Sequence, residues 1–295
     1  MFYHLRTRVI NSISGMFAHA DMPLSGTSEY QGDPGLCGPG SVSWWVIGDV
    51  SVFVGGIRAL LIQAAHPEVA AGVDDHSRYR DDPLGRLSRT SFYVTSATYG
   101  AMPEVEEAIS RVRAAHRGVS GSSHRGRDYS ASTSEFAAWV HNTLTDSFLE
   151  AYQGFRGRLS EAEADQFVSE QTKAGEMLGA SPMPTTARGL RRWITSHPDL
   201  APSPGMHAAL AFLGNPPLPA SQKIGYRVLL NGAVTTIPTE VNRVLGLQTP
   251  PASRFSCAGL VLILRRIMQH SPAWQAALER CDVPYDPRLF RDVVG

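Results

Sequence analysis

The stretch "DVSVFVGGIRALLIQAAHPEVA", residues 49–70, decides the fold, because it is apolar on nearly every side at a helical spacing. A helix that is apolar all round is typical of a protein core. The pattern stops at His66-Pro67, since proline disfavours helical backbone in the residue before it. We therefore expect a buried central helix that ends near His66, with the imidazole capping its last carbonyls.

The segments after this helix also repeat their apolar residues at the helical period rather than at the strand period. Residues 103–118 begin with Pro103 and acids and end at a glycine, and residues 160–179 begin with the capping-box pair Ser160 and Glu163. Further helices are expected from a cap at Thr133 or Ser134 onward, and at 185–196, 204–213, 220–247 and 255–270. The pattern predicts an all-α fold, with a single globular helical domain over residues 35–295 and an irregular N-terminal arm over residues 1–34. A division into two lobes near residue 181 is the alternative.

Composition narrows the class of protein. The chain has 295 residues, 43% of them apolar, which is enough to bury a large core without disulfides or a structural metal. Lys+Arg and Asp+Glu balance at 27 each, so we expect no nucleic-acid partner. Cys37, Cys257 and Cys281 form no CxxC pair, and no signal peptide or membrane-spanning apolar run of about 20 residues is found. We expect a cytoplasmic protein without a transmembrane segment, and a homo-oligomer remains open.

Histidines are the main candidates for chemistry. No Walker loop, GxGxxG after a strand, GxSxG or HExxH occurs, which argues against the common nucleotide, hydrolase and zinc-protease reactions. His116 shares the apolar stripe of its helix with Val105 and Ile109, so its imidazole is predicted to face inward. Such a residue is either a core histidine bonded to a carbonyl or a ligand of a metal or haem iron. His141, in line with Phe148, leaves the same two alternatives open.

The stretch "HSRYRDDPLGRLSRT", residues 76–90, is unusually rich in polar groups for a turn between two helices. Arg86, Arg89 and Thr90 lie three and four residues apart, so they share one face if a helix begins here. One reading is a pair of solvated arginines beside a helix start. The other is two fixed cations and a hydroxyl above a pocket, where they can bind an oxygen-derived ligand or cofactor carboxylates.

Four segments together carry a resemblance to a known family. They are "GLCGPGSVSWWVIGD" (35–49), "GGIRALLIQAAHPEVAAGVDDHSRYRDDPLGRLSRT" (55–90), "AAHRGV" (114–119) and "WVHNTLTDSFLEAY" (139–152). Over residues 35 to 250 the chain resembles the bacterial family of the latex clearing protein, or rubber oxygenase. The same family includes the fungal oxygenase that trims a prenyl chain in mycophenolic acid synthesis.

The resemblance implies an all-helical b-type haem enzyme that adds dioxygen across an alkene and cleaves it to two carbonyls. "RLSRT" corresponds to the family's distal arginine, lysine and threonine, with Arg89 in the place of the lysine. The axial ligand of the iron corresponds to His116, with His141 as the fallback. Because an arginine does not lose its proton at ordinary pH, it does not ligate iron as that lysine does. No single residue corresponds to the family's catalytic carboxylate; the nearby acids are Glu68, Asp74, Asp75 and Asp81.

Three hypotheses follow from different classes of protein. The first is a haem b-dependent oxygenase, an oxidoreductase that takes dioxygen or peroxide and a small apolar or prenyl-like substrate. His116 would hold the iron, and Arg86, Arg89 and Thr90 would bind the cofactor and polarise the oxygen ligand. The second is a haem-binding or sensing protein without turnover. The third is a non-haem helical protein with a metal among His66, His76, His116 and His141.

Overall fold

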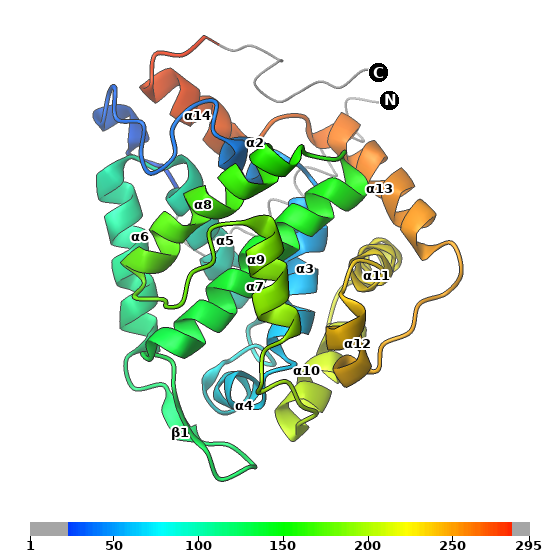
Figure 1. Ribbon diagram of the computed structural model, residues 1–295. Coiled ribbons are helices and arrows are strands. Elements are labelled where there is room, and N and C mark those ends of the chain that lie inside the picture. Colours follow the sequence, from blue (N-terminus) through cyan, green and yellow to red (C-terminus); the bar gives the residue numbers. More distant parts are fainter. Residues whose placement is uncertain (1–22, 285–295) are drawn as a thin grey trace. The chain divides into compact units, whose positions relative to one another are not determined.

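The computed structural model describes residues 23–284, and helices dominate that range (Figure 1). Within it lie the 3-10 helix η1, thirteen α-helices and two short strands, β1 (Ser120–Ser122) and β2 (Asp128–Ser130), which pair antiparallel. The all-α fold is therefore confirmed. Most of the expected N-terminal arm, residues 1–22, lies outside the described residues.

The described residues form two compact units whose segments interleave along the sequence. Unit 1 contains residues 23–50, 78–114 and 263–284, and unit 2 contains residues 51–77 and 115–262. The boundaries fall inside two helices, α6 (Met102–His116) and α13 (Ser253–Met268), and none falls near residue 181. Each unit is described below by itself.

The core of unit 2 is the pair of helices α3 (Val52–Gln63) and α7 (Ser134–Phe155), which pack along each other (Figure 1). The close packing depends on Gly55, because a Cβ there would lie 2.7 Å from Cδ1 of Phe148 and 3.1 Å from its Cα. Helix α3 ends at Gln63, and α4 (Pro67–His76) begins at Pro67, so the predicted break is confirmed. The junction places His66 between two helices rather than at the end of one.

Charged groups cross this apolar core. Arg58 on α3 is fully buried; its guanidinium donates to Oγ of Ser147 at 2.8 Å and to the carbonyl of Thr236 at 3.2 Å, and it lies 2.8 Å from Oδ2 of Asp146. Arg191 reaches the same carboxylate at 3.4 Å. The apolar helix α3 therefore carries one arginine whose charge is balanced inside the core.

Five further helices of unit 2 lie around this pair. They are α8 (Glu161–Met177), α9 (Ala187–Thr195), α10 (Pro204–Gly214), α11 (Ala220–Val234) and α12 (Thr239–Leu245). The capping box predicted at Ser160 and Glu163 is present at the start of α8. The single helix predicted over 220–247 is wrong, because α11 ends at Val234 and α12 begins after Pro238. Proline has no N–H to continue a helical hydrogen-bond ladder.

A fully buried arginine in unit 1, Arg280, is the last residue of α14 (Pro272–Arg280). Its guanidinium donates to the carbonyl of Asp33 at 2.8 Å, to Oγ1 of Thr27 at 2.6 Å and to the carbonyl of Tyr99 at 2.8 Å. These bonds join three segments that are far apart in the sequence. The other elements of the unit are η1 (Thr27–Glu29), α2 (Val42–Gly48), α5 (Pro83–Tyr99), α14 (Pro272–Arg280) and the parts of α6 and α13 named above.

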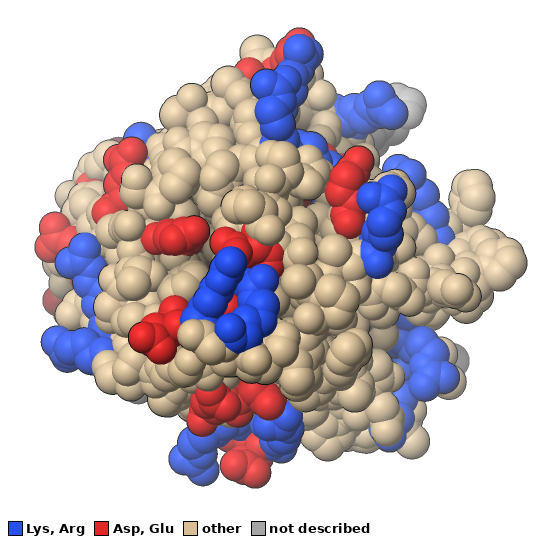
Figure 2. Space-filling model, turned by 60° about the horizontal axis from the view of Figure 1, so that its bottom comes forward, with Lys and Arg blue, Asp and Glu red and all other residues tan. Residues whose placement is uncertain are grey.

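Within residues 23–284, no single helix is long and apolar enough to cross a membrane. Helices α2 and α3 meet the criteria of length and composition only as a bent pair. The face drawn in Figure 2 carries basic and acidic side chains side by side, separated by wide uncharged areas. Charges of both signs therefore mix on this face.

Candidate functional site

Arg86, Arg89 and Thr90 lie in the first turns of α5 in unit 1, so the expected helix start is confirmed. Asp82 caps this helix by accepting a hydrogen bond from the Gly85 N–H at 2.9 Å. The Arg89 guanidinium lies 3.3 Å from Oδ2 of Asp82 and is 60% exposed. The Gly85 N–H and the Arg89 guanidinium both hold the pKa of Asp82 below its ordinary value. The capping residue Asp82 therefore also pairs with the charged end of Arg89 at the helix start.

The other two members of this trio differ from Arg89 in their surroundings. Arg86 is half-buried, its guanidinium carbon lies 5.8 Å from the centroid of the Tyr79 ring, and desolvation lowers its pKa. Thr90 is exposed, and its hydroxyl donates to the carbonyl of Arg86 at 3.1 Å. The three side chains share one face as the spacing predicts, with Arg86 the most desolvated of the three.

His116 is the last residue of α6. The sequence predicts that its imidazole faces inward with the apolar residues of this helix, and the structure differs. Val105 and Ile109 are buried, but the last turn of the helix, residues 113–116, is exposed throughout. The predicted inward orientation is wrong because the helix continues beyond its packed part. Partial desolvation still lowers the pKa of His116, and the imidazole forms no hydrogen bond or ion pair with any residue in the described part of the chain. The imidazole of His116 is therefore neutral and accessible, and its ring nitrogen can act as a metal ligand.

His141 on α7 is a core histidine. It is buried, and its Nε2 donates to the carbonyl of Gln171 on α8 at 2.8 Å. Gly175 makes room for the ring, since a Cβ there would lie 2.9 Å from Cδ2 of His141. Burial lowers the pKa of His141 to about 4. Of the two alternatives left open by the sequence, the hydrogen-bonded core histidine describes this residue.

A second cluster lies in unit 2, and the sequence did not indicate it as a group. His66 at the junction of α3 and α4, and His197 and Asp199 in the loop after α9, place ligand atoms within 4.8 Å of one another. Burial and the neighbouring His197 lower the pKa of His66 to about 4, so this imidazole is neutral at pH 7. Burial also lowers the pKa of His197.

The role predicted for His66 as a cap of α3 is not found. Neither ring nitrogen of His66 has a hydrogen-bond partner among the described residues, although both are buried. The ring is instead surrounded by other rings, with centroid distances of 5.2 Å to His197, 5.4 Å to Phe136 and 5.6 Å to Trp139. Buried polar groups without a partner are rare, so this imidazole needs an explanation.

Four acids were considered above as candidates for the catalytic carboxylate. Of these, Glu68 is the buried one. It is 3% exposed; it accepts a hydrogen bond from the Ser123 hydroxyl at 2.8 Å and pairs with the Arg125 guanidinium. Although burial opposes ionisation, these hydrogen bonds hold the pKa of Glu68 below its ordinary value. The carboxylate is therefore ionised, and its Oε2 lies 3.5 Å from Nδ1 of His66.

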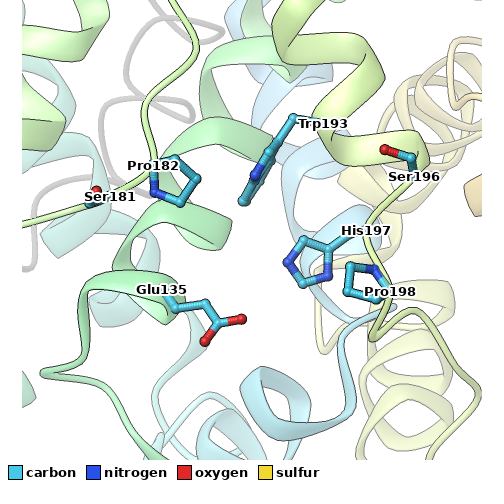
Figure 3. A pocket seen from close by; sticks show the side chains of 7 residues that line it. All are labelled: Glu135, Ser181, Pro182, Trp193, Ser196, His197 and Pro198. Carbon is cyan, nitrogen blue, oxygen red and sulfur yellow. The ribbon is translucent and has the colours of Figure 1, made fainter.

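A cavity of about 400 Å³ opens beside this cluster. Figure 3 shows His197 and Trp193 directed into it from α9 and the loop that follows, with the Glu135 carboxylate below them. Pro182 and Pro198 form parts of its wall. The cavity gives a small molecule access to the imidazole of His197.

Comparisons with known proteins identify the class. Residues 44–268 match the family model described as "ER-bound oxygenase mpaB/B'/Rubber oxygenase, catalytic domain". The match covers most of the 295 residues, so the chain contains a catalytic domain of the oxygenase class. It belongs to the family of mpaB and rubber oxygenases, as the sequence resemblance predicted. No match was found among curated proteins or among solved structures.

Proposed function

We propose that this protein is a haem b-dependent oxygenase that acts on a small apolar or prenyl-like molecule inside the cell, with dioxygen or peroxide as co-substrate. Membership of an oxygenase family supports the reaction class. The observation that carries the haem proposal is His116, a neutral imidazole without a partner within residues 23–284 at the end of α6. A bound haem would supply the iron chemistry that activates oxygen.

The two histidines differ in their fitness as an axial ligand. An axial histidine needs a free ring nitrogen and space on that side of the ring for a flat macrocycle. His116 meets both conditions, since its ring is accessible and unbonded. His141 meets neither, because its Nε2 is bonded to Gln171 and its ring is packed against Gly175. The geometry thus supports His116 over His141.

The residues at the start of α5 are suited to binding an anionic or polar oxygen ligand. Arg86 and Arg89 supply fixed positive charge, and guanidinium groups grip carboxylates and oxygen anions through several N–H donors. Asp82 restricts the Arg89 guanidinium, so part of its ordering is complete before a ligand arrives. Thr90 donates to the Arg86 carbonyl, which leaves its oxygen as an acceptor for a proton on the ligand.

The proposal is tested by expressing the full chain with added haem precursor and recording its absorption spectrum. We expect an intense Soret band with one haem per chain in the wild type and in His141→Gln, and loss of the band in His116→Ala. A colourless wild-type protein would contradict the haem proposal, and loss of haem only in the His141 variant would contradict the choice of ligand.

Turnover separates an oxygenase from a haem-binding or sensing protein without a reaction. We expect oxygen consumption to rise when short prenyl compounds are added to the haem-loaded protein, with carbonyl products detected by mass spectrometry. Haem binding without substrate-dependent oxygen consumption across a panel of alkenes would instead support the sensing protein.

A further inference from the structure

We propose that His66, His197 and Asp199 form a binding site for a divalent transition metal of the Fe²⁺ or Zn²⁺ type, separate from the haem site proposed above. Their ligand atoms lie within 4.8 Å of one another, so a small movement of the side chains brings all three into contact with one ion. Metal–nitrogen and metal–oxygen bonds to such ions are about 2.0–2.2 Å long. The site lies wholly within unit 2.

The first argument is the state of His66. It is 1% exposed, and both ring nitrogens lack a hydrogen-bond partner among residues 23–284. Leaving a buried donor or acceptor unpaired costs about 1–3 kcal/mol. A metal ion at one nitrogen removes this penalty, because the lone pair then has a partner.

The second argument is the carboxylate beside His66. A histidine that binds a metal through one nitrogen commonly donates its other N–H to a carboxylate, which fixes the ring and raises its basicity. Oε2 of Glu68 lies 3.5 Å from Nδ1 of His66, on the side that suits this role. Nε2 of His66 is therefore the nitrogen left for the ion. Glu68 itself is held by Arg125 and Ser123.

The third argument is the way Asp199 is held. Arg127 and Arg125 both contact Oδ1 of Asp199, and no described residue bonds to its Oδ2. The arginines thus fix the carboxylate and leave one oxygen for an ion. Glu68 and Asp199 balance the charges of these two arginines, so the two neutral imidazoles are not next to uncompensated positive charge.

His197 completes the set from the loop after α9. The Asp199 N–H lies 3.4 Å from Nδ1 of His197, near the upper limit for a hydrogen bond. Binding of an ion through Nε2 requires the ring proton on Nδ1, so this weak hydrogen bond is lost when the ion binds. Trp139 and Trp193 both pack against the ring, with centroid distances of 4.8 Å and 5.1 Å.

The donor set selects the kind of ion. Two imidazoles and one carboxylate suit Zn²⁺, Fe²⁺ and similar ions, whereas Ca²⁺ and Mg²⁺ prefer sites built from oxygen alone. Three protein ligands leave coordination positions open, as in catalytic zinc sites and in non-haem iron oxygenases. The cavity beside His197 gives water or a small ligand access to those positions (Figure 3).

The test uses the full chain after dialysis against a chelator, with Co²⁺ as the spectroscopic probe and Zn²⁺ for calorimetry. We expect one Co²⁺ per chain with visible absorption bands, displacement by Zn²⁺, and competition by Fe²⁺ without oxygen. Asp199→Asn and His197→Ala should each weaken Zn²⁺ binding by roughly tenfold or more. Both variants keep His66, the most buried of the three ligands.

Two control variants make the result specific. His207→Ala removes an exposed histidine of unit 2 outside the cluster and should leave Zn²⁺ affinity unchanged. His116→Ala should abolish haem binding and keep the Co²⁺ bands, so failure of one site is distinguishable from failure of the other. Absence of saturable Co²⁺ and Zn²⁺ binding by the wild type, or equal affinity in Asp199→Asn and wild type, overturns the proposal.

Discussion

The guanidinium of Arg58 and the carboxylate of Asp146 lie 2.8 Å apart in the core of unit 2, with side chains that are 0% and 2% exposed. Burial of two opposite charges is tolerated only while each keeps its partner. Arg58→Met leaves Asp146 with Arg191 alone, 3.4 Å away. We expect the free energy of unfolding in urea to fall by about 3–5 kcal/mol.

Two further variants test whether the expected loss of stability arises because the unpaired charge is buried. Arg188→Met breaks an exposed pair with Glu161 and should change the free energy of unfolding by less than about 1 kcal/mol. The double variant Arg58→Met with Asp146→Leu should be more stable than Arg58→Met alone, because no unpaired charge then remains in the core. Equal effects of Arg58→Met and Arg188→Met would show that burial does not matter here.

Two adjacent glycines of α3 should respond in opposite directions to the same substitution. A Cβ at Gly55 would lie 2.7 Å from the Phe148 ring and 3.1 Å from the Ser147 carbonyl oxygen, whereas a Cβ at Gly56 meets nothing within 4 Å. Gly55→Ala should lower the free energy of unfolding by about 1–3 kcal/mol through overpacking. Gly56→Ala should raise it by about 0.5–1 kcal/mol, because alanine favours the helix. Denaturant unfolding of both variants checks the signs.

Much of the fold was predictable because its signals are local. The capping box at Ser160 and the break at Pro67 act within one turn of helix, and both are found. The interruption before Pro238 was missed, although proline is a local signal, because apolar residues continue across it. The partner of Arg58 could not be predicted from the sequence either. Asp146 is 88 residues away, and only the packing of α3 on α7 brings the two together.

The candidate site likewise has features that follow from local sequence and features that depend on distant contacts. The common face of Arg86, Arg89 and Thr90 follows from helical spacing and was predictable. The exposure of His116 was not, because the stripe of apolar residues does not show where the supporting elements end. His66 and His197 are 131 residues apart, so no motif spacing signals their meeting. The sequence did contain one signal, a histidine followed by a proline at each position, which predicts the end of a helix with an imidazole beside it.

Buried histidine should make the protein less stable in mild acid. Burial lowers the pKa of His141 to about 4, against 6.5 when the chain is unfolded. Between these values the unfolded state binds more protons, so the free energy of unfolding falls as the pH decreases from 6.5 toward 4. From pH 7 to pH 5 the contribution of His141 is about 2 kcal/mol. Between pH 7 and pH 5, the free energy of unfolding of His141→Gln should fall by about 2 kcal/mol less than that of the wild type. An unchanged pH dependence would contradict the neutral core histidine.

Replacement of Arg89 tests whether the polar stretch at residues 76–90 serves catalysis or only solvation. Its guanidinium is tied to Asp82 at 3.3 Å, and the cap of the helix depends on the Gly85 N–H rather than on Arg89. Arg89→Ala should therefore fold normally and keep its haem. If the charge stabilises the oxygen ligand, oxygen-dependent turnover should fall by about a hundredfold. Arg80→Ala, which removes another exposed arginine of the same stretch, should leave turnover unchanged.

Arg89→Lys gives a second readout that a solvated surface charge would not produce. Lysine keeps the positive charge at neutral pH, so it should restore part of the turnover lost in Arg89→Ala. Unlike arginine, a lysine amine can lose its proton and become a ligand of haem iron. We therefore expect a low-spin, six-coordinate spectrum to develop at high pH in Arg89→Lys and not in the wild type. If the two spectra match at every pH and Arg89→Ala turns over normally, Arg89 lies too far from the iron to act on it, and its pairing with Asp82 is its whole role.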